Sequence, residues 1–342
     1  MATTPRRQSF SRPLSQIGLR MARRFAGFVF VACAAVMDVQ FSCAQATAEF
    51  HRNLTVSPAQ PAMLDVDLSS GDLQIVYGRD GQVSITAIAR ASADARLEDN
   101  FFSGVLAVAQ EGNRLTFRDA PHAAFAEAGV NVAYRIDVPY RTEVISTLGR
   151  GDQSISGILG PVRAVAHSGD IKVSYVSQGT QAQVDQGNLE IQVIGEHVEA
   201  KVGAGNISCT RIRQGVSAET EDGDITLMVV GPSSAKVKNG RGRIDVGGAR
   251  GSLIASTAEG DLRVKAIPHD EWQITSVSGN IRLEFPPAAK LELAASTSAG
   301  EFQIDRDDMT KPAPGLHRFE QKVNGGGKRI EAHTGSGKIV IR

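Results

Sequence analysis

The chain has 342 residues, and its 37 basic and 37 acidic side chains give a formal net charge of zero. This balance argues against binding to nucleic acid or to an anionic membrane surface through charge, because both need a basic excess. Aromatic residues make up only 5% of the chain, whereas glycine occurs 35 times. This composition is typical of a globular protein with many tight turns, and it disfavours helical bundles and disordered chains.

The N-terminal segment has the order of a secretory signal. It begins with Met-Ala-Arg-Arg at 21–24, continues as an almost wholly apolar run from Phe25 to Met37, and ends in the small-x-small motif of residues 44–46. The apolar run is too short to span a bilayer, which separates a signal from a membrane anchor. We therefore interpret residues 1–46 as an N-terminal extension and signal, and expect export. A buried N-terminal helix is the alternative.

Cysteine usage follows from that cleavage. Cys33 and Cys43 leave with the signal, and the mature chain keeps only Cys209. One thiol cannot form an internal disulfide, so the stability of the protein must come from packing and backbone hydrogen bonds. The sequence has no spacing typical of a metal or haem site, and we predict no cofactor.

A glycine corner recurs at a nearly constant interval along most of the chain. The glycines from 169 to 300 are separated by steps of 18, 18, 18, 19, 18, 19 and 21 residues, and each is followed by a polar and then an apolar residue. Such a period indicates a solenoid of stacked repeats. The corners with Asp or Asn after the glycine form the predicted turn ladder: Gly169-Asp170, Gly187-Asn188, Gly205-Asn206, Gly223-Asp224, Gly260-Asp261 and Gly279-Asn280.

Apolar residues alternate with polar ones on both sides of each corner. After Gly223, for example, Ile225 and Leu227 are apolar and Thr226 is polar, and before it Val216 and Ala218 follow the same rule. A period of two is the spacing of a strand with one buried face, so each repeat contains two short strands. Cys209 and Trp272 occupy inward positions of this pattern, which predicts that both are buried.

These patterns predict an all-β fold, a parallel β-helix or β-solenoid with about 18 residues per turn. Right-handed crossover is the default for parallel strands, so we expect a right-handed coil. Residues 47–149 are expected to form N-terminal rungs and a cap, with residues 78–81 as a hairpin turn, and residues 150–342 the regular repeats of the same domain. The segment from Asp305 to Gln321 is an insertion before the last rung.

The serial corners, the early Ser70-Gly71-Asp72-Leu73 and the closing residues 324–327 and 332–339 resemble the bacterial putative-adhesin family of β-strand repeats, a domain-of-unknown-function family. The resemblance covers about residues 50–342. It implies a β-helical fold on an exported protein, and it supplies no catalytic residues. Arg243, Glu301 and Lys338 depart from the family pattern, because they replace the usual Asp or Asn.

The acidic ladder has two interpretations. Stacked carboxylates can bind calcium, but calcium β-rolls use a nine-residue repeat with more glycines than this chain has. Asp and Asn side chains also bind turn backbone, while glycine supplies the unusual dihedral angles. We therefore predict a structural ladder with no metal site.

For function, the sequence favours an exported, non-enzymatic β-solenoid that offers a binding or scaffolding surface in the bacterial cell envelope, in the periplasm or on the cell surface. Its partner, a protein or a glycan, is not identified, and we expect no nucleic acid and no transmembrane segment in the mature chain. A carbohydrate-active enzyme resembling polysaccharide lyases is the alternative. An envelope-stress sensor module is a further alternative. We predict no catalytic residues, because no catalytic motif is visible.

Export gives a direct test. We expect the mature protein to begin at Thr47 and to be recovered outside the cytoplasm, because the signal is removed after Ala46. N-terminal sequencing of the protein from cell fractions measures this, and an uncleaved cytoplasmic product would contradict it.

Overall fold

The computed structural model describes residues 46–92, 97, 101–120 and 129–342. The predicted signal lies outside these residues, apart from Ala46. Within the described part of the chain every regular element is a β-strand, so the all-β prediction is confirmed. The same residues contain no helix of the length and apolar character that a membrane span needs.

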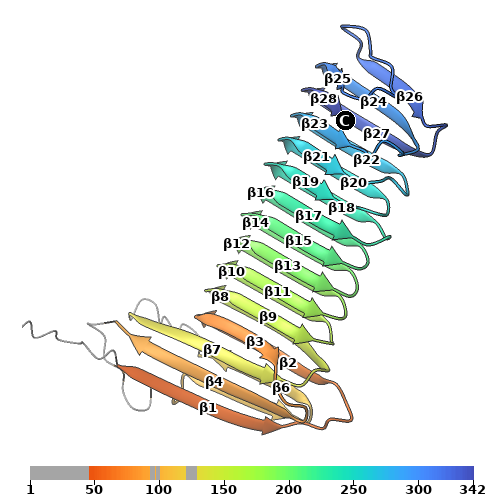
Figure 1. The fold of residues 1–342 in the computed structure, drawn as a ribbon. Helices are drawn as coiled ribbons and strands as arrows, with labels where there is room; N and C mark the ends of the chain where they lie inside the picture. The colour runs from red at the N-terminus through yellow and green to blue at the C-terminus, as the bar shows by residue number, and fades with distance from the viewer. Residues whose placement is uncertain (1–45, 93–96, 98–100, 121–128) are drawn as a thin grey trace, which may run out of the picture. The chain divides into compact units, whose positions relative to one another are not determined.

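The strands form two sheets of 14 strands each, and the regular part of both sheets is parallel (Figure 1). Each rung places one strand in each sheet, as in a solenoid. In the first sheet the regular strands are β9 (Gln153–Ile158), β11 (Ile171–Val176), β13 (Leu189–Ile194), β15 (Ile207–Ile212), β17 (Ile225–Val230), β19 (Ile244–Gly247), β21 (Leu262–Lys265) and β23 (Ile281–Glu284). In the second they are β8 (Thr142–Arg150), β10 (Val162–Ser168), β12 (Thr180–Gln186), β14 (Val198–Ala204), β16 (Val216–Asp222), β18 (Ala235–Arg241), β20 (Leu253–Glu259) and β22 (Trp272–Ser278).

Neighbouring rungs pair in register through equivalent positions of the repeat. Ile171 lies opposite Leu189, which lies opposite Ile207. In the second sheet Val198 lies opposite Val216 in the same way. Because like positions face one another, every inward residue of a strand stacks on inward residues of the neighbouring strands.

The core lies between the two sheets and is one continuous cluster of apolar side chains. Strand β13 alternates buried Leu189 and Ile191 with partly exposed Glu190, as the sequence pattern predicts. Cys209 and Trp272 are both fully buried, which confirms their predicted inward positions. Burial raises the pKa of the Cys209 thiol to about 12, so this group stays protonated and behaves as a small apolar side chain.

The first rung does not pair with the strand directly after it in the chain. Its strands β2 (Ala62–Ser70) and β3 (Asp72–Tyr77) pair directly with β8 and β9. The intervening chain forms β4 (Gln82–Ala91), β5 (Leu106–Glu111), β6 (Arg114–Asp119) and β7 (Val130–Val138), while β1 (Thr47–Thr55) pairs with β4.

The predicted hairpin across residues 78–81 is wrong. Strand β7 lies between β3 and β4, parallel to the first and antiparallel to the second. The hairpin fails because β7 supplies a nine-residue strand that covers the edge of β3, and this long-range pairing has no signal in the local turn. Strands β5 and β6 do form the expected hairpin.

The last rung of the sequence is likewise not the last rung of the stack. The C-terminal strands β27 (Lys328–Ser336) and β28 (Ile339–Ile341) insert between β22/β23 and the preceding rung of β24 (Leu291–Ala299) and β25 (Phe302–Ile304). The insertion that precedes them ends in β26 (Arg318–Val323), which pairs antiparallel with β24. A simple stack in chain order is therefore wrong at both ends.

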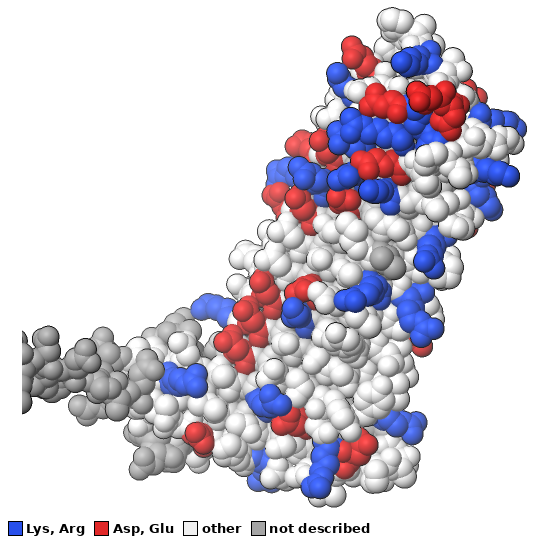
Figure 2. Space-filling model, in the orientation of Figure 1, with Lys and Arg blue, Asp and Glu red and all other residues white. Residues whose placement is uncertain are grey.

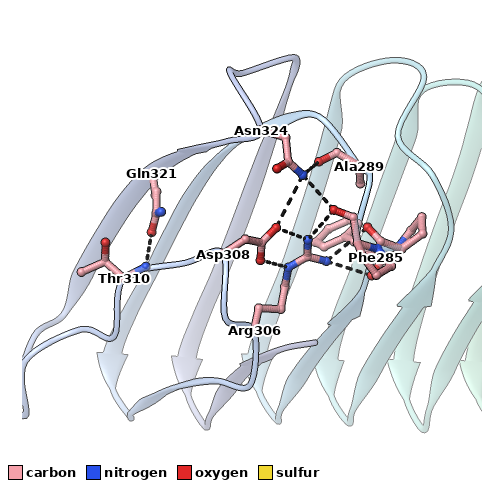
Figure 3. A network of polar contacts seen from close by, with 9 residues as sticks. Phe285, Ala289, Arg306, Asp308, Thr310, Gln321 and Asn324 are labelled. Atoms are coloured by element: carbon pink, nitrogen blue, oxygen red, sulfur yellow. Dashed lines mark hydrogen bonds and ion pairs between the residues drawn. The ribbon is translucent and has the colours of Figure 1, made fainter.

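A buried arginine ties this C-terminal arrangement together (Figure 3). Arg306 is only 6% exposed and donates two hydrogen bonds to the Asp308 carboxylate, at 2.8 and 2.6 Å, and one to the carbonyl of Phe285 at 2.8 Å. The hydrogen bond from Arg306 holds the pKa of Asp308 below its ordinary value. Asn324 donates to the carbonyls of Pro287 and Ala289 at 2.8 and 2.9 Å. These bonds satisfy loop carbonyls that strand pairing leaves free.

The stacked core predicts a sharp difference between inward and outward substitutions. Leu227→Asp should lower the free energy of unfolding by more than about 4 kcal/mol, because it buries an unpaired charge. Thr210→Asp is the control, since Thr210 faces outward between the uncharged Gln192 and Met228, and it should change stability by less than about 0.5 kcal/mol. Denaturant unfolding measures both, and similar losses in the two variants would contradict the assigned register.

Candidate functional site

The glycine corners bring the backbones of successive rungs into direct contact. Gly187 has a φ of +143°, and a Cβ atom there would lie 2.1 Å from the carbonyl oxygen of Gly169. Gly205 repeats both features against Gly187, with a distance of 2.0 Å. Any side chain at these corners would therefore force the rungs apart, in addition to adopting an unfavourable dihedral angle.

The Asp or Asn after each glycine bonds the next rung. Asp170 accepts a hydrogen bond from the backbone N–H of Asn188 at 2.7 Å, and Asn188 accepts one from Asn206 at 3.1 Å. Asp224 accepts from Arg243 N–H at 2.7 Å, and Asp261 from Asn280 N–H at 2.8 Å. The bonds run between rungs rather than within one turn, so each side chain joins two repeats.

A second row of polar groups lies on the inward side of the same corners. Asn239 donates to the carbonyl of Gly223 at 2.8 Å, Thr220 to that of Gly205 at 3.2 Å, and Thr334 to that of Gly279 at 2.8 Å. All three side chains are buried. The inward alternation identified their positions, but it did not indicate that a polar residue there would satisfy the glycine carbonyl.

A candidate binding site is a hollow of about 650 Å³ where the antiparallel strands β4 and β7 meet the first parallel strands. Four carboxylates line it, and the first three belong to the corner row: Asp72, Asp152, Asp170 and Glu190. Arg135 and Lys172 are its basic residues, and Ile88 and Ala133 supply apolar surface. The hollow therefore combines an apolar wall with an acidic edge, a combination that suits a polar ligand with an apolar face.

The charged groups of the hollow are already engaged with protein partners. Lys172 lies 2.9 Å from a carboxylate oxygen of Glu190, and Arg135 lies 2.9 Å from one of Asp137. Asp72 and Asp152 each use one oxygen to accept the N–H of the next rung, which leaves the second oxygen as a further acceptor. These contacts fix the orientation of the side chains before any ligand arrives.

Charge is distributed unevenly along the face shown in Figure 2. Acidic and basic side chains crowd together over β19 to β28, whereas they are more widely spaced over the strands before them. In the crowded part Arg263 forms two hydrogen bonds to Glu284, at 3.1 and 3.3 Å, and these bonds hold the pKa of Glu284 below its ordinary value. This end of the sheet is therefore a network of ion pairs between neighbouring rungs.

A small polar cluster lies at the first rung, beside the hollow. The Asp119 carboxylate accepts hydrogen bonds from the backbone N–H of Ser69, at 2.8 Å, and from its hydroxyl. Burial raises the pKa of Asp119 in spite of these bonds. Burial, and then the charge of Asp119, also raise the pKa of Tyr134, whose ring packs against Phe117. The Tyr134 hydroxyl therefore stays protonated at physiological pH.

Only one end of the predicted ladder lies at the hollow. Asp170 and Asn188 line the hollow, whereas Asp224 and Asp261 lie further along the stack. Arg243 interrupts the row, because its side chain has no acceptor for the N–H of Asp261. Among the described residues, no group of three or more His, Cys, Asp or Glu side chains is arranged to hold a metal ion. Sequence reasoning missed the hollow, since residues from 72 to 190 meet there only through the non-sequential pairing of β3, β7 and β9.

The ladder generates a prediction with an internal control. Asp224→Ala should lower the free energy of unfolding by about 1 kcal/mol, because the N–H of Arg243 loses its acceptor. Arg243→Ala occupies the same ladder position without removing an acceptor, and it should change stability by less than about 0.5 kcal/mol. Melting temperatures with and without calcium complete the test, and a calcium-dependent rise that Asp224→Ala abolishes would show that the ladder binds metal instead.

Part of the chain matches a known family, and several solved structures are similar to it. The Toastrack DUF4097 family model matches residues 180–342. Similar solved structures include a putative adhesin from Bacteroides fragilis, 14% identical, covering 86% of this chain and 97% of that chain with a TM-score of 0.41. Others are a putative lipid binding protein from Parabacteroides distasonis, 12% identical over 86% and 97% with a TM-score of 0.39, and a putative adhesin from the same species, 11% identical over 86% and 97% with a TM-score of 0.38. No curated protein gives a significant match. The expected resemblance is confirmed, since residues 180–342 match the model of the Toastrack DUF4097 family, a family of unknown function.

Proposed function

We propose that this protein is exported to the bacterial cell envelope and acts there as a non-enzymatic binding surface. The signal pattern of residues 1–46 supports export, with Thr47 as the first residue of the mature chain. In this proposal residues 47–149 cap the stack and residues 150–342 supply its repeats. The outward strand faces are the working surface, and the hollow beside β4 and β7 is its principal site.

The observation that carries this proposal is the paired state of the charges in the hollow. Lys172 is held by Glu190 and Arg135 by Asp137, so both basic groups are fixed in place by carboxylates. Preorganised polar groups beside an apolar wall favour tight and selective binding, because little side-chain freedom is lost when a ligand binds. A base that must abstract a proton needs a different environment, with an accessible and unengaged nitrogen.

We also infer the finer geometry of the coil. The pairing of Val162 with Thr180, and of Thr180 with Val198, supports a turn of about 18 residues. The strong preference for right-handed connections between parallel strands supports a right-handed coil.

One observation favours the alternative, a polysaccharide lyase. The hollow brings Asp152, Asp170 and Glu190 together with Arg135 and Lys172 on the outer face of a parallel β-stack. Clustered acids with a basic residue are what a lyase would need to hold an acidic sugar and remove a proton from it. This alternative requires Lys172 or Arg135 to leave its carboxylate partner when the substrate binds.

The proposed role can be tested with isolated cell envelopes. The purified mature protein should sediment with envelopes, and Ile88→Glu should reduce the bound fraction several-fold, because it places a charge on the apolar wall of the hollow. Ile88 faces outward and is partly exposed, so the core remains intact. Thr210→Glu, outward on β15 and outside the lining of the hollow, is the control and should bind like the unmodified protein.

Failure of the unmodified protein to sediment with envelopes would overturn the proposed role. The same protein, incubated with polygalacturonate and calcium, should yield no unsaturated sugar products by ultraviolet absorbance. Formation of such products, lost in Lys172→Gln, would establish the lyase instead.

A further inference from the structure

A second surface lies on the opposite side of the stack from the glycine corners. There each regular strand of the first sheet ends and the chain returns to the second sheet, for example through residues 177–179 and 213–215. We call this side the loop edge. Three of its side chains are tyrosines with large exposed fractions: Tyr77 at 49%, Tyr140 at 42% and Tyr175 at 63%. The rings of Tyr77 and Tyr140 meet edge to face, with centroids 5.6 Å apart.

The loop edge contains a row of residues with left-handed backbone. Tyr175, Val193 and Arg211 have φ values of 56°, 55° and 56°, at equivalent positions of successive rungs. Strand pairing skips these positions: Ser174 lies opposite Gln192, and the next pair is Val176 with Ile194. The same position is Gly157 in the rung before Tyr175 and Gly248 in the rung of β19, with φ values of 73° and 72°.

Glycine is the residue that this backbone favours, because other residues are strained there and a β-branched residue such as Val193 is strained most. Tyr175 gains little from folding in return, since most of its side chain is in water. Backbone strain of this kind, carried by exposed side chains, is a reason to look for a role outside folding. This row carries Tyr175, Val193 and Arg211 in place of glycine, and of the three Tyr175 and Arg211 are exposed.

The part of the loop edge from β3 to β15 is also basic. Arg79, Arg141, Arg211 and Arg213 are all exposed there, and none forms an ion pair among the residues that the structure describes. Elsewhere on the surface, Arg241 and Arg263 are paired across rungs. In this stretch of the edge, from β3 to β15, the acids in the loops are Asp80, which accepts the N–H of Tyr140 at 3.1 Å, and Glu196. Positive charge that is not neutralised locally attracts an anionic partner.

The spacing of these groups points to a regular polymer. Tyr77 lies against Gly157, which is one rung from Tyr175, so the two rings are separated by two inter-strand steps, roughly 10 Å. Arg211 follows after two further steps. Gly157 itself adds no side chain between the two rings. Two sugars of an extended polysaccharide span a similar length, so the repeat of the edge matches the repeat of such a chain.

We propose that the loop edge binds an anionic polysaccharide, with its sugar rings stacked on Tyr77 and Tyr175 and its acidic groups paired with Arg211, Arg213, Arg79 and Arg141. Tyrosine offers a flat ring at low entropic cost, and the planar guanidinium of arginine binds carboxylates through two parallel hydrogen bonds. The exposed side chains of Ser177, Gln178 and Gln214, on the same edge, provide hydrogen bonds for sugar hydroxyls. The inference rests on the proposed binding role and adds to it a second surface and a ligand class.

The test uses the mature protein with oligogalacturonate as the carboxylated probe and cello-oligosaccharide as the neutral one, by titration calorimetry. The unmodified protein should bind the carboxylated probe more tightly than the neutral one, with an affinity that falls as salt is added. Tyr175→Gly should weaken binding of the carboxylated probe roughly tenfold or more, while its melting temperature stays equal to or above that of the unmodified protein. Arg211→Gly should weaken binding and reduce the salt dependence.

Val193→Gly is the matched control, because it relieves the same backbone strain between the two functional positions. It should match Tyr175→Gly in melting temperature and retain binding. Equal affinity in Tyr175→Gly and Val193→Gly would overturn the proposal, as would the absence of binding by the unmodified protein. Loss of binding in Arg211→Gly alone would reduce the edge to a site of non-specific charge attraction, and would also overturn it. These outcomes leave envelope sedimentation and the Ile88→Glu result unaffected, so the two proposals can fail separately.

Discussion

The structure depends on the close contact between glycine backbones at the corners of successive rungs. A Cβ at Gly223 would lie 2.0 Å from the carbonyl oxygen of Gly205, and most other corners are equally close. This contact sets the register of both sheets, because each corner joins a strand of one sheet to a strand of the other. Once the register is fixed, inward residues stack on inward residues, and a slip of one position would turn every apolar side chain to water.

The corner also explains why two kinds of polar residue accompany the glycine. On the outer side Asp170 accepts the N–H of the next rung, and on the inner side residues such as Asn239 donate to a glycine carbonyl. Both groups belong to backbone that strand pairing leaves without a partner, and a buried group of this kind is costly when it is unsatisfied. The glycine allows the close approach, and its neighbours complete the hydrogen bonds that the approach requires.

The sequence predicts this repeating part of the fold well, because glycine spacing and alternation are local signals. It fails at the ends, where the chain must cover exposed strand edges. Strand β7 inserts beside β3, and β28 inserts between β23 and β25, through pairings that connect residues far apart in the sequence. The hollow could not be predicted for the same reason. Ile88 and Arg135 join Asp170 there only because β4 and β7 extend the sheet beyond the first rung.

The glycine corners and the loop edge are under different structural constraints. At the glycine corners the contact between rungs determines the residue types, so these residues say little about function. At the loop edge the backbone again favours glycine, yet Tyr175, Val193 and Arg211 occupy the position at a cost of about 1–2 kcal/mol each. A protein stable by only about 5–15 kcal/mol bears such a cost at a small number of sites. Residues that the fold requires therefore define the architecture, whereas residues that the fold disfavours mark the surface on which a partner acts.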